Sequence, residues 1–367
     1  MKKLDVNKEG KFCYAIRFEE DFNALARELA DLGFQGRKLC IVTDSHVAPL
    51  YLEKVKECLK MKFENVTEFI IPAGEKNKTL DQVKRIYEHL ILQHFDRKDL
   101  LIALGGGVVG DMTGYTAATY LRGIDFIQVP TTLLSQVDSS IGGKTGVDFD
   151  SYKNMVGAFH MPRLVYMNLS VLNTLSEEQF SCGMGEILKH GLIKNYDYFR
   201  WCMDNAELIK QRDIEALRYM ITESCKIKRD VVEKDPTEQG DRALLNFGHT
   251  LGHAVEKLKD FKMLHGQCVA AGCVAAMKLS LMRELISEED LLMAENCFRS
   301  FGLPVFTRGI TADDILKISK SDKKMEAGKI KFVLLKEPGN AYVDHTVTDE
   351  ELLQAAEYIL KNEDTHL

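Results

Sequence analysis

The sequence predicts an α/β amino-terminal domain with a mostly parallel, Rossmann-like sheet, followed by an all-α carboxyl-terminal domain. In the first half, apolar segments of strand length alternate with helical patterns, which is typical of a parallel sheet covered on both faces. After about residue 174 the hydrophobic pattern is almost wholly helical. We therefore divide the 367-residue chain into domains 1–175 and 176–367.

The elements of the first domain follow from this alternation. Short apolar runs predict strands at 12–16, 39–43, 66–71, 100–104, 124–129 and 164–167, and helical periodicity falls between them at 21–32, 47–61 and 80–94. Ligands bind at the carboxyl ends of the strands in such sheets, so polar residues at those ends are informative. These residues are Asp44, Glu75, the glycines at 105–107, and the pair Thr131 and Thr132.

The second domain begins at a capping box formed by Ser176 and Gln179. Predicted helices follow at 176–194, 213–232, 247–259, 267–285, 287–300, 313–319 and 349–361, interrupted by one short strand at 330–335. The sequence shows neither an internal repeat nor a linker rich in proline and glycine. We therefore expect the two domains to abut across a cleft.

Composition describes a globular protein of the cytoplasm. Apolar residues make up 45% and charged residues 28%, and the net charge of −7 argues against nucleic acid as a partner. Nine cysteines without a C-x-x-C pair are typical of reduced thiols. The sequence shows neither the apolar run of a signal peptide nor a segment of membrane-spanning length, so we expect no membrane association.

One predicted strand ends on three consecutive glycines, which let backbone N–H groups approach a ligand closely. A helix after them would direct its positive end at a phosphate. Gly105, Gly107 and Gly110 fit the dinucleotide pattern G-x-G-x-x-G, which alone is a weak signal. The triplet at 143–145 resembles the end of a P-loop, but Asp138 stands where that motif requires its first glycine.

Asp44 ends another predicted strand, and two interpretations of it are equally good. An acidic residue at this position takes the ribose hydroxyls of NAD and repels the extra phosphate of NADP. Aspartate is also a favoured helix N-cap. Together with the glycine loop at a second strand end, Asp44 favours a dinucleotide site.

The helical half contains candidate metal ligands. Glu186 and Lys189 are one turn apart on one helix, and His249 and His253 lie at i and i+4 on another, with His265 twelve residues further on. One carboxylate with two or three imidazoles suits Zn²⁺, and a catalytic site would leave one position open for substrate. The spacing is not H-E-x-x-H, so a metalloprotease is unsupported.

Several cations stand among these motifs in a chain that is acidic overall. They predict an anionic substrate that carries phosphate and carboxylate groups. The cations are Arg122, Lys144, Lys153, Lys189, Lys228, Arg242 and the pair Lys323 and Lys324.

Taken together, these motifs resemble those of 3-dehydroquinate synthase, a family of the sugar phosphate cyclase superfamily that serves the shikimate pathway. The likeness covers nearly the whole chain, although the loop 148–152, His190 and Pro236 depart from the common family pattern. It rests on residues 72–78 (PAGEKNK), 105–111 (GGGVVGD), 122–123 (RG), 130–132 (PTT), 136–146 (QVDSSIGGKTG), 153–154 (KN), 185–189 (GEILK), 245–253 (LNFGHTLGH) and 265–266 (HG), with Lys228, Val231, Val232, Asp235 and Arg242.

The resemblance implies a set of site residues. Zn²⁺, with Co²⁺ as a substitute, would bind Glu186, His249 and His265, and His253 would contact substrate or transfer a proton. NAD would bind Asp44, Glu75, Lys78, Gly106, Gly107, Val108, Asp111, Thr131, Thr132, Leu134, Lys144, Lys153 and Thr174. The substrate would be held by Arg122, Asp138, Lys144, Asn154, Lys189, Lys228, Arg242, Asn246 and either Lys323 or Lys324, of which we select Lys324.

The resemblance also implies an activity and an assembly. The family converts 3-deoxy-D-arabino-heptulosonate 7-phosphate into 3-dehydroquinate and phosphate through transient oxidation by NAD, β-elimination of phosphate, re-reduction, ring opening and an aldol closure. A homodimer is expected from the family. The alternatives are a metal- and NAD-dependent polyol or alcohol dehydrogenase, a sister sugar phosphate cyclase, and a non-catalytic NAD-binding regulator. The many cations argue against a dehydrogenase.

Overall fold

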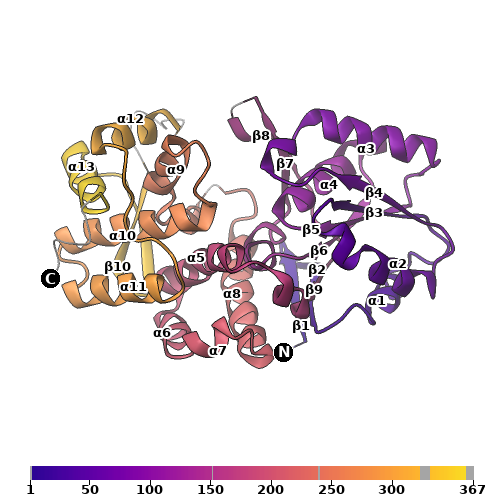
Figure 1. Ribbon diagram of the computed structural model, residues 1–367, viewed down its shortest axis with the longest axis horizontal. Helices are drawn as coiled ribbons and strands as arrows, with labels where there is room; N and C mark the ends of the chain where they lie inside the picture. The colour runs from indigo at the N-terminus through magenta and orange to yellow at the C-terminus, as the bar shows by residue number, and fades with distance from the viewer. Residues whose placement is uncertain (1, 151, 239, 323–330, 361–367) are drawn as a thin grey trace. The chain divides into compact units, whose positions relative to one another are not determined.

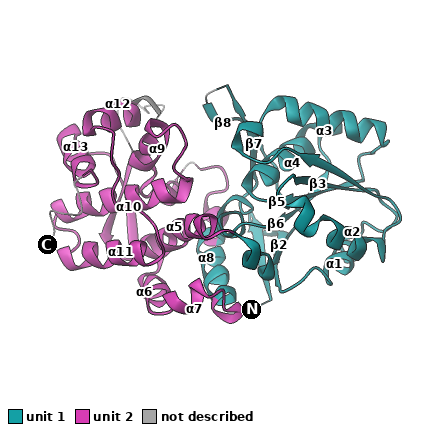
Figure 2. Ribbon diagram, in the orientation of Figure 1, with its two compact units in different colours: residues 1–175, 217–229 teal, residues 176–216, 230–367 magenta. Residues whose placement is uncertain are grey.

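The computed structural model describes residues 2–150, 152–238, 240–322 and 331–360 of the chain. These residues form two compact units, Met1–Leu175 with Leu217–Arg229, and Ser176–Ala216 with Asp230–Leu367 (Figure 2). The division differs from the predicted domains in one respect, because the middle of helix α8 (Ile214–Lys234) belongs to the first unit.

Arg218 contributes to this attachment of α8. Its guanidinium donates to the carbonyl oxygen of Phe18 at 3.1 Å and forms an ion pair with Glu20. Hydrophobic periodicity predicts the helix itself, but it does not predict to which unit each turn of the helix belongs.

The first unit is built on a seven-stranded sheet in the order β1-β2-β9-β6-β5-β3-β4. Neighbouring strands run parallel except β1 and β2, which form an antiparallel edge. The strands are β1 (Lys3–Lys8), β2 (Lys11–Glu19), β3 (Leu39–Asp44), β4 (Val66–Ile71), β5 (Leu100–Gly105), β6 (Asp125–Pro130) and β9 (Leu164–Asn168). All six predicted strands are present, so the mostly parallel sheet is confirmed. β1 was missed because only Leu4 and Val6 of it are buried.

Apolar clusters cover both faces of this sheet, because successive side chains of a strand point to opposite faces. Helices α1 and α2 cover one face, and α3 and α4 cover the other (Figure 1). Ile41 belongs to the cluster formed with α1 and α2, and its neighbour Val42 belongs to the cluster formed with α3 and α4. The helices are α1 (Leu25–Asp31), α2 (Glu53–Lys60), α3 (Leu80–Leu92) and α4 (Gly107–Thr119).

Two helix starts show how side chains near a helix determine where it begins. The helix predicted from residue 21 begins only at Leu25, because the Asp21 carboxylate accepts a hydrogen bond from the backbone N–H of Asn23 at 2.8 Å and holds a turn there. At the start of α5 (Glu177–Lys194), the Ser176 hydroxyl accepts from the backbone N–H of Gln179 at 3.3 Å, as predicted for a cap.

A separate antiparallel hairpin of the first unit, β7 (Lys144–Phe149) with β8 (Tyr152–Phe159), was not predicted. Glycine is depleted in strands, and Gly146 and Gly157 face each other across this hairpin. The hairpin packs against α4 at Gly114, where a Cβ atom would lie 2.3 Å from a side chain of β7. Small residues therefore determine this contact more than hydrophobic pattern does.

The second unit is helical, as predicted, and its described residues also contain one hairpin. The predicted strand pairs with a second, unpredicted one, as β10 (Phe332–Glu337) with β11 (Asn340–Asp344). The helices are α5, α6 (Tyr196–Asp204), α7 (Ala206–Lys210), α9 (His249–Leu258), α10 (His265–Met282), α11 (Glu288–Ser300), α12 (Ala312–Asp322) and α13 (Asp349–Tyr358). Helices α6 and α7 are short and were not predicted.

The cysteines are present as free thiols. All nine cysteines are free, and every one except Cys13 is buried. Within the described residues, we find no helix with the length and apolar character needed to cross a bilayer.

Glycines let helices α5, α9 and α10 approach one another closely. A Cβ atom on Gly266, in the first turn of α10, would lie 1.8 Å from the carbonyl oxygen of Cys182 on α5. A Cβ atom on Gly272 of α10 would lie 1.9 Å from the carbonyl oxygen of Gly248, which precedes α9. Both contacts are with backbone atoms, which cannot move aside as a flexible side chain can. No residue larger than glycine fits either position without moving a helix.

We predict that Gly266→Ala separates α5 from α10 and destabilises the chain. Overpacking of a buried contact costs about 1–3 kcal/mol, and a clash with backbone belongs at the upper end of that range. Denaturant unfolding followed by circular dichroism measures the loss. An unfolding midpoint equal to that of the unaltered chain would contradict the close contact.

Candidate functional site

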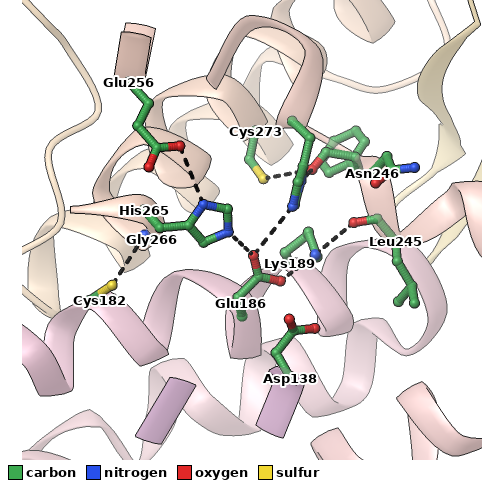
Figure 3. Close-up of polar contacts among 12 residues, drawn as sticks. Asp138, Cys182, Glu186, Lys189, Leu245, Asn246, Glu256, His265, Gly266 and Cys273 are labelled. Atoms are coloured by element: carbon green, nitrogen blue, oxygen red, sulfur yellow. Dashed lines mark hydrogen bonds and ion pairs between the residues drawn. The ribbon is translucent and has the colours of Figure 1, made fainter. Parts of the chain in front are cut away.

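A buried ion pair on α5 forms the centre of the candidate site in the second unit. Glu186 and Lys189 are each 1% exposed and pair with one another (Figure 3). The Lys189 ammonium also donates to the carbonyl oxygen of Leu245 at 2.7 Å. Burial of an unpaired charge has a high desolvation free energy, and here each of the two groups is paired with the other.

Two histidines lie beside the Glu186 carboxylate, and a third histidine lies beside these two. Its Oε1 atom lies 3.3 Å from Nε2 of His265 and 3.6 Å from Nε2 of His249. The ring of His253 lies 4.9 Å from that of His249, centroid to centroid. One ligand atom from each of the three imidazoles lies within 4.8 Å of the others. A carboxylate oxygen and several imidazole nitrogens are donors that suit Zn²⁺, so the residues fit a divalent metal.

The electrostatics of this group follow from burial and close charges. Although burial opposes it, Lys189 and the two nearest histidines hold the pKa of Glu186 well below its usual range. Burial, with the nearby Lys189 ammonium, lowers the pKa of His249 well below its usual value. Burial also disfavours charge on His265, but the carboxylates of Glu186 and Glu256 raise its pKa to about 10. Glu186 therefore offers an ionised oxygen and His249 a neutral nitrogen.

A loop of the second unit positions two further predicted residues. Asp235 accepts hydrogen bonds from the backbone N–H groups of Gly240 at 2.7 Å and Arg242 at 3.0 Å. The buried Arg242 guanidinium donates to the carbonyl oxygen of Pro236 at 2.7 Å. The Asn246 amide donates to Glu238 at 3.1 Å. This loop thus presents a cation and an amide, both suited to a carboxylate or phosphate.

In the first unit, Lys228 and Asp138 form a second pair of predicted residues. The Lys228 ammonium, on α8, contacts both the carboxylate and the carbonyl oxygen of Asp138, the latter at 2.5 Å. Lys228 is buried and Asp138 half-buried. These are two side chains that the sequence places ninety residues apart.

The glycine loop lies between β5 and α4, as the motif predicted. Gly106 is the N-cap of α4, so no side chain caps the free N–H groups at the start of this helix. A Cβ atom on Gly106 would lie 3.1 Å from the Thr132 side chain, and the N–H of Thr131 donates to the carbonyl oxygen of Gly105 at 3.0 Å. Uncapped N–H groups at a helix start form a binding site for phosphate. Val108 lies in the first turn of this helix.

Lys78 joins several predicted residues of the first unit. Its ammonium lies 2.7 Å from Asp111 Oδ2, 2.5 Å from Asn154 Oδ1 and 3.9 Å from Glu75 Oε1. Burial raises the pKa of Asp111, and the Lys78 charge acts in the opposite direction. Although burial opposes the charge, Asp111 and Glu75 raise the pKa of Lys78. The structure therefore brings together residues from three separate motifs, 72–78, 105–111 and 153–154.

Asp44 holds a turn just before a helical segment at Ala48–Leu52. Its Oδ1 atom accepts hydrogen bonds from the backbone N–H groups of His46 at 2.8 Å and Val47 at 3.0 Å. The N-cap of the helical segment is Val47, without a side-chain cap, so Asp44 does not occupy the N-cap position. One carboxylate oxygen, Oδ2, is left outside these two bonds.

The remaining predicted residues are more scattered. Thr174 bonds to the Tyr51 hydroxyl, and Leu134 directly precedes a helical turn at Ser135–Ser139. Arg122, Lys144 and Asn154 are exposed and Lys153 is half-buried. Arg122 and Asn154 have positive φ angles of 70° and 55°. Lys323 and Lys324 lie outside the described residues.

Glu256, a buried carboxylate on α9, belongs to none of the motifs that predicted the site. Its Oε2 atom lies 3.6 Å from Nδ1 of His265. The spacing offered a signal, since Glu256 is three residues after His253 and seven after His249, and so shares their helix face.

Two family models together match most of the chain. Residues 68–182 match the family model described as 3-dehydroquinate synthase N-terminal, and residues 183–325 match the model described as 3-dehydroquinate synthase C-terminal. The 3-dehydroquinate synthase of Acetivibrio thermocellus is 41% identical over 354 residues, which cover 96% of this chain and 98% of that protein. That of Shewanella piezotolerans is 46% identical over 320 residues, which cover 87% and 89%.

Two solved structures extend the comparison. A 2-epi-5-epi-valiolone synthase from Streptomyces hygroscopicus subsp. jinggangensis, with NAD⁺ and Zn²⁺ bound, aligns with a TM-score of 0.87 and 26% identity over 97% of this chain and 99% of its own. An iron-containing alcohol dehydrogenase aligns with a TM-score of 0.66 at 17% identity, over 95% and 97%. This second likeness shows a shared fold alone.

Proposed function

The chain belongs to the 3-dehydroquinate synthase family, and we propose that it converts 3-deoxy-D-arabino-heptulosonate 7-phosphate into 3-dehydroquinate and phosphate. The observation that best supports this activity is the buried pair of Glu186 and Lys189 with three histidines beside it. The carboxylate and imidazoles offer ligands to a metal, while the lysine offers a positive charge to an anionic substrate.

Glu186, His249 and His265 are the proposed ligands of Zn²⁺, with Co²⁺ as a substitute. The distances of 3.6 and 3.3 Å from Glu186 Oε1 to Nε2 of His249 and of His265 support this set, because both nitrogens lie close to one carboxylate oxygen. His253 lies beside them and is assigned to substrate contact or proton transfer. When bound, the metal would act as a Lewis acid toward the substrate.

The proposed NAD site is the carboxyl edge of the parallel sheet. The uncapped start of α4 suits a pyrophosphate, and the pair of the buried Lys78 and the half-buried Asp111 lies beside it. NAD⁺, when bound, would supply the transient oxidation and its reversal. The proposed contacts are Asp44, Glu75, Lys78, Gly106, Gly107, Val108, Asp111, Thr131, Thr132, Leu134, Lys144, Lys153 and Thr174.

The proposed substrate contacts are mostly cations and amides, which suit a sugar acid that carries a phosphate. Positive charges placed where phosphate departs stabilise the developing anion, and fixed side chains hold one molecule in reacting geometry. These residues are Arg122, Asp138, Lys144, Asn154, Lys189, Lys228, Arg242, Asn246 and Lys324, the last outside the described residues.

We also infer a homodimer that acts in the cytoplasm. Nine free cysteines support a reducing compartment, because paired cysteines are typical of oxidising ones. The homodimer rests on the family resemblance alone.

The activity is tested by supplying the heptulosonate phosphate, NAD⁺ and Zn²⁺ to the full chain. We expect phosphate and 3-dehydroquinate to form in equal amounts, with no accumulation of NADH at 340 nm, because the hydride returns to the intermediate in each turnover. Accumulation of NADH with simple polyols, without phosphate release, would identify a dehydrogenase. Activity only with a different sugar phosphate would identify a sister cyclase.

We predict that His265→Ala removes stoichiometric zinc and abolishes turnover while the chain stays folded. The variant loses one of three proposed ligands, whereas the exposed His345→Ala in the same unit should keep both zinc and activity. Elemental analysis of the purified proteins measures the metal, and circular dichroism checks the fold. Retention of full zinc by His265→Ala would exclude this ligand.

We predict that Asp44→Asn separates the local turn at residues 44–47 from NAD recognition. Asparagine forms such side-chain-to-backbone turns as aspartate does, so the melting temperature should change little. The Kd for NAD⁺ should rise about tenfold, because hydrogen bonds to a charged acceptor contribute about 1.5–3 kcal/mol. Asp44→Ala should lose both the turn and the NAD contact. An unchanged Kd in both variants would restrict Asp44 to the turn.

A further inference from the structure

The imidazole of His265 lies between two buried carboxylates, one at each ring nitrogen (Figure 3). Nε2 faces Glu186 Oε1 at 3.3 Å, and Nδ1 faces Glu256 Oε2 at 3.6 Å. Glu256 is 5% exposed. A buried carboxylate at an imidazole nitrogen determines which of the two nitrogens carries the proton and which remains for a metal.

Glu256 adds a second carboxylate beside the proposed ligand set. The first, Glu186, is already paired with the buried Lys189 ammonium. Glu256 lies on the side of His265 away from Glu186, 3.6 Å from Nδ1. A carboxylate there would attract a divalent cation.

We propose that Glu256 is a positioning residue of the metal site. Its carboxylate accepts the Nδ1 proton of His265, holds the ring with Nε2 toward Glu186, and adds negative charge beside the ligand set. Glu256 itself does not bind the metal or the substrate. This inference rests on the proposed function, because it assumes a metal held by Glu186, His249 and His265.

A purely structural role for Glu256 makes a different prediction. A buried carboxylate that only supports the fold would, when replaced, lower stability and leave metal affinity unchanged in the folded fraction. The second unit offers a matched control in Glu295, which is 2% exposed, pairs with Arg299 at 3.3 Å and accepts from the Tyr358 hydroxyl at 2.7 Å. Glu295 is not one of the proposed metal or substrate ligands.

The test compares Glu256→Gln, Glu256→Asp and Glu295→Gln with the unaltered chain, each stripped of metal. Competition with a chromophoric chelator gives the Kd for Zn²⁺, and the visible absorption of the Co²⁺ form reports ligand geometry. We expect Glu256→Gln to weaken zinc binding about 10- to 100-fold and to alter the Co²⁺ spectrum, as is typical when a carboxylate behind a ligating histidine is lost. The Kd of Glu256→Asp for Zn²⁺ should lie between those of Glu256→Gln and the unaltered chain. Glu295→Gln should bind Zn²⁺ with the Kd of the unaltered chain.

The outcomes are distinguishable. A Kd and a Co²⁺ spectrum unchanged in Glu256→Gln would overturn the inference, whatever the melting temperature does. If Glu256→Gln does not fold, Glu256→Asp decides in its place, because its carboxylate is one methylene further from Nδ1. An unaltered chain that binds no zinc would instead refute the proposed metal site itself.

Discussion

The close approach of helices α5, α9 and α10 is the constraint on which the site of the second unit depends. Glu186 is on α5, His249 begins α9 and His265 begins α10, so the three donors meet only if the helix backbones nearly touch. Gly266 and Gly272 permit this, since a Cβ atom at either position would lie within 2 Å of a carbonyl oxygen. Backbone contact also leaves little freedom for relative movement, which suits a site whose donor atoms must stay within tenths of an ångström of their places.

That packing creates an electrostatic problem, which the arrangement of side chains resolves. Helices this close exclude water, and an isolated carboxylate or ammonium there would cost several kcal/mol or become neutral. Glu186 stays ionised because Lys189 and the histidines replace its lost hydration. Lys189 stays in place because Glu186 and the Leu245 carbonyl oxygen accept its protons. The packing of the helices therefore holds these charges together.

Hydrophobic pattern predicted the repeating parts of the fold and failed where single contacts decide. Most of the six parallel strands are buried apolar runs, which periodicity detects, although only Ile71 of the edge strand β4 is buried. The β7–β8 hairpin and β11 depend on pairing between short segments, and the attachment of α8 to the first unit depends partly on Arg218. Helix spacing placed His249 and His253 on one face, but it could not show that Glu186 and His265 lie beside them. Glu256 shares that face, and its position 3.6 Å from His265 likewise depends on contact between residues of two helices.

Three buried lysines show one principle repeated in both units. Lys78, Lys189 and Lys228 are each at most 5% exposed, and each pairs with a carboxylate, on Asp111, Glu186 and Asp138 respectively. A lysine held in this way is already charged and oriented, so an anion that reaches it meets a preorganised cation rather than a flexible side chain. For Lys78, Asp111 and Glu75 raise the pKa although burial opposes the charge. The acidic partners are thus part of the arrangement that keeps these cations in place inside a chain that is acidic overall.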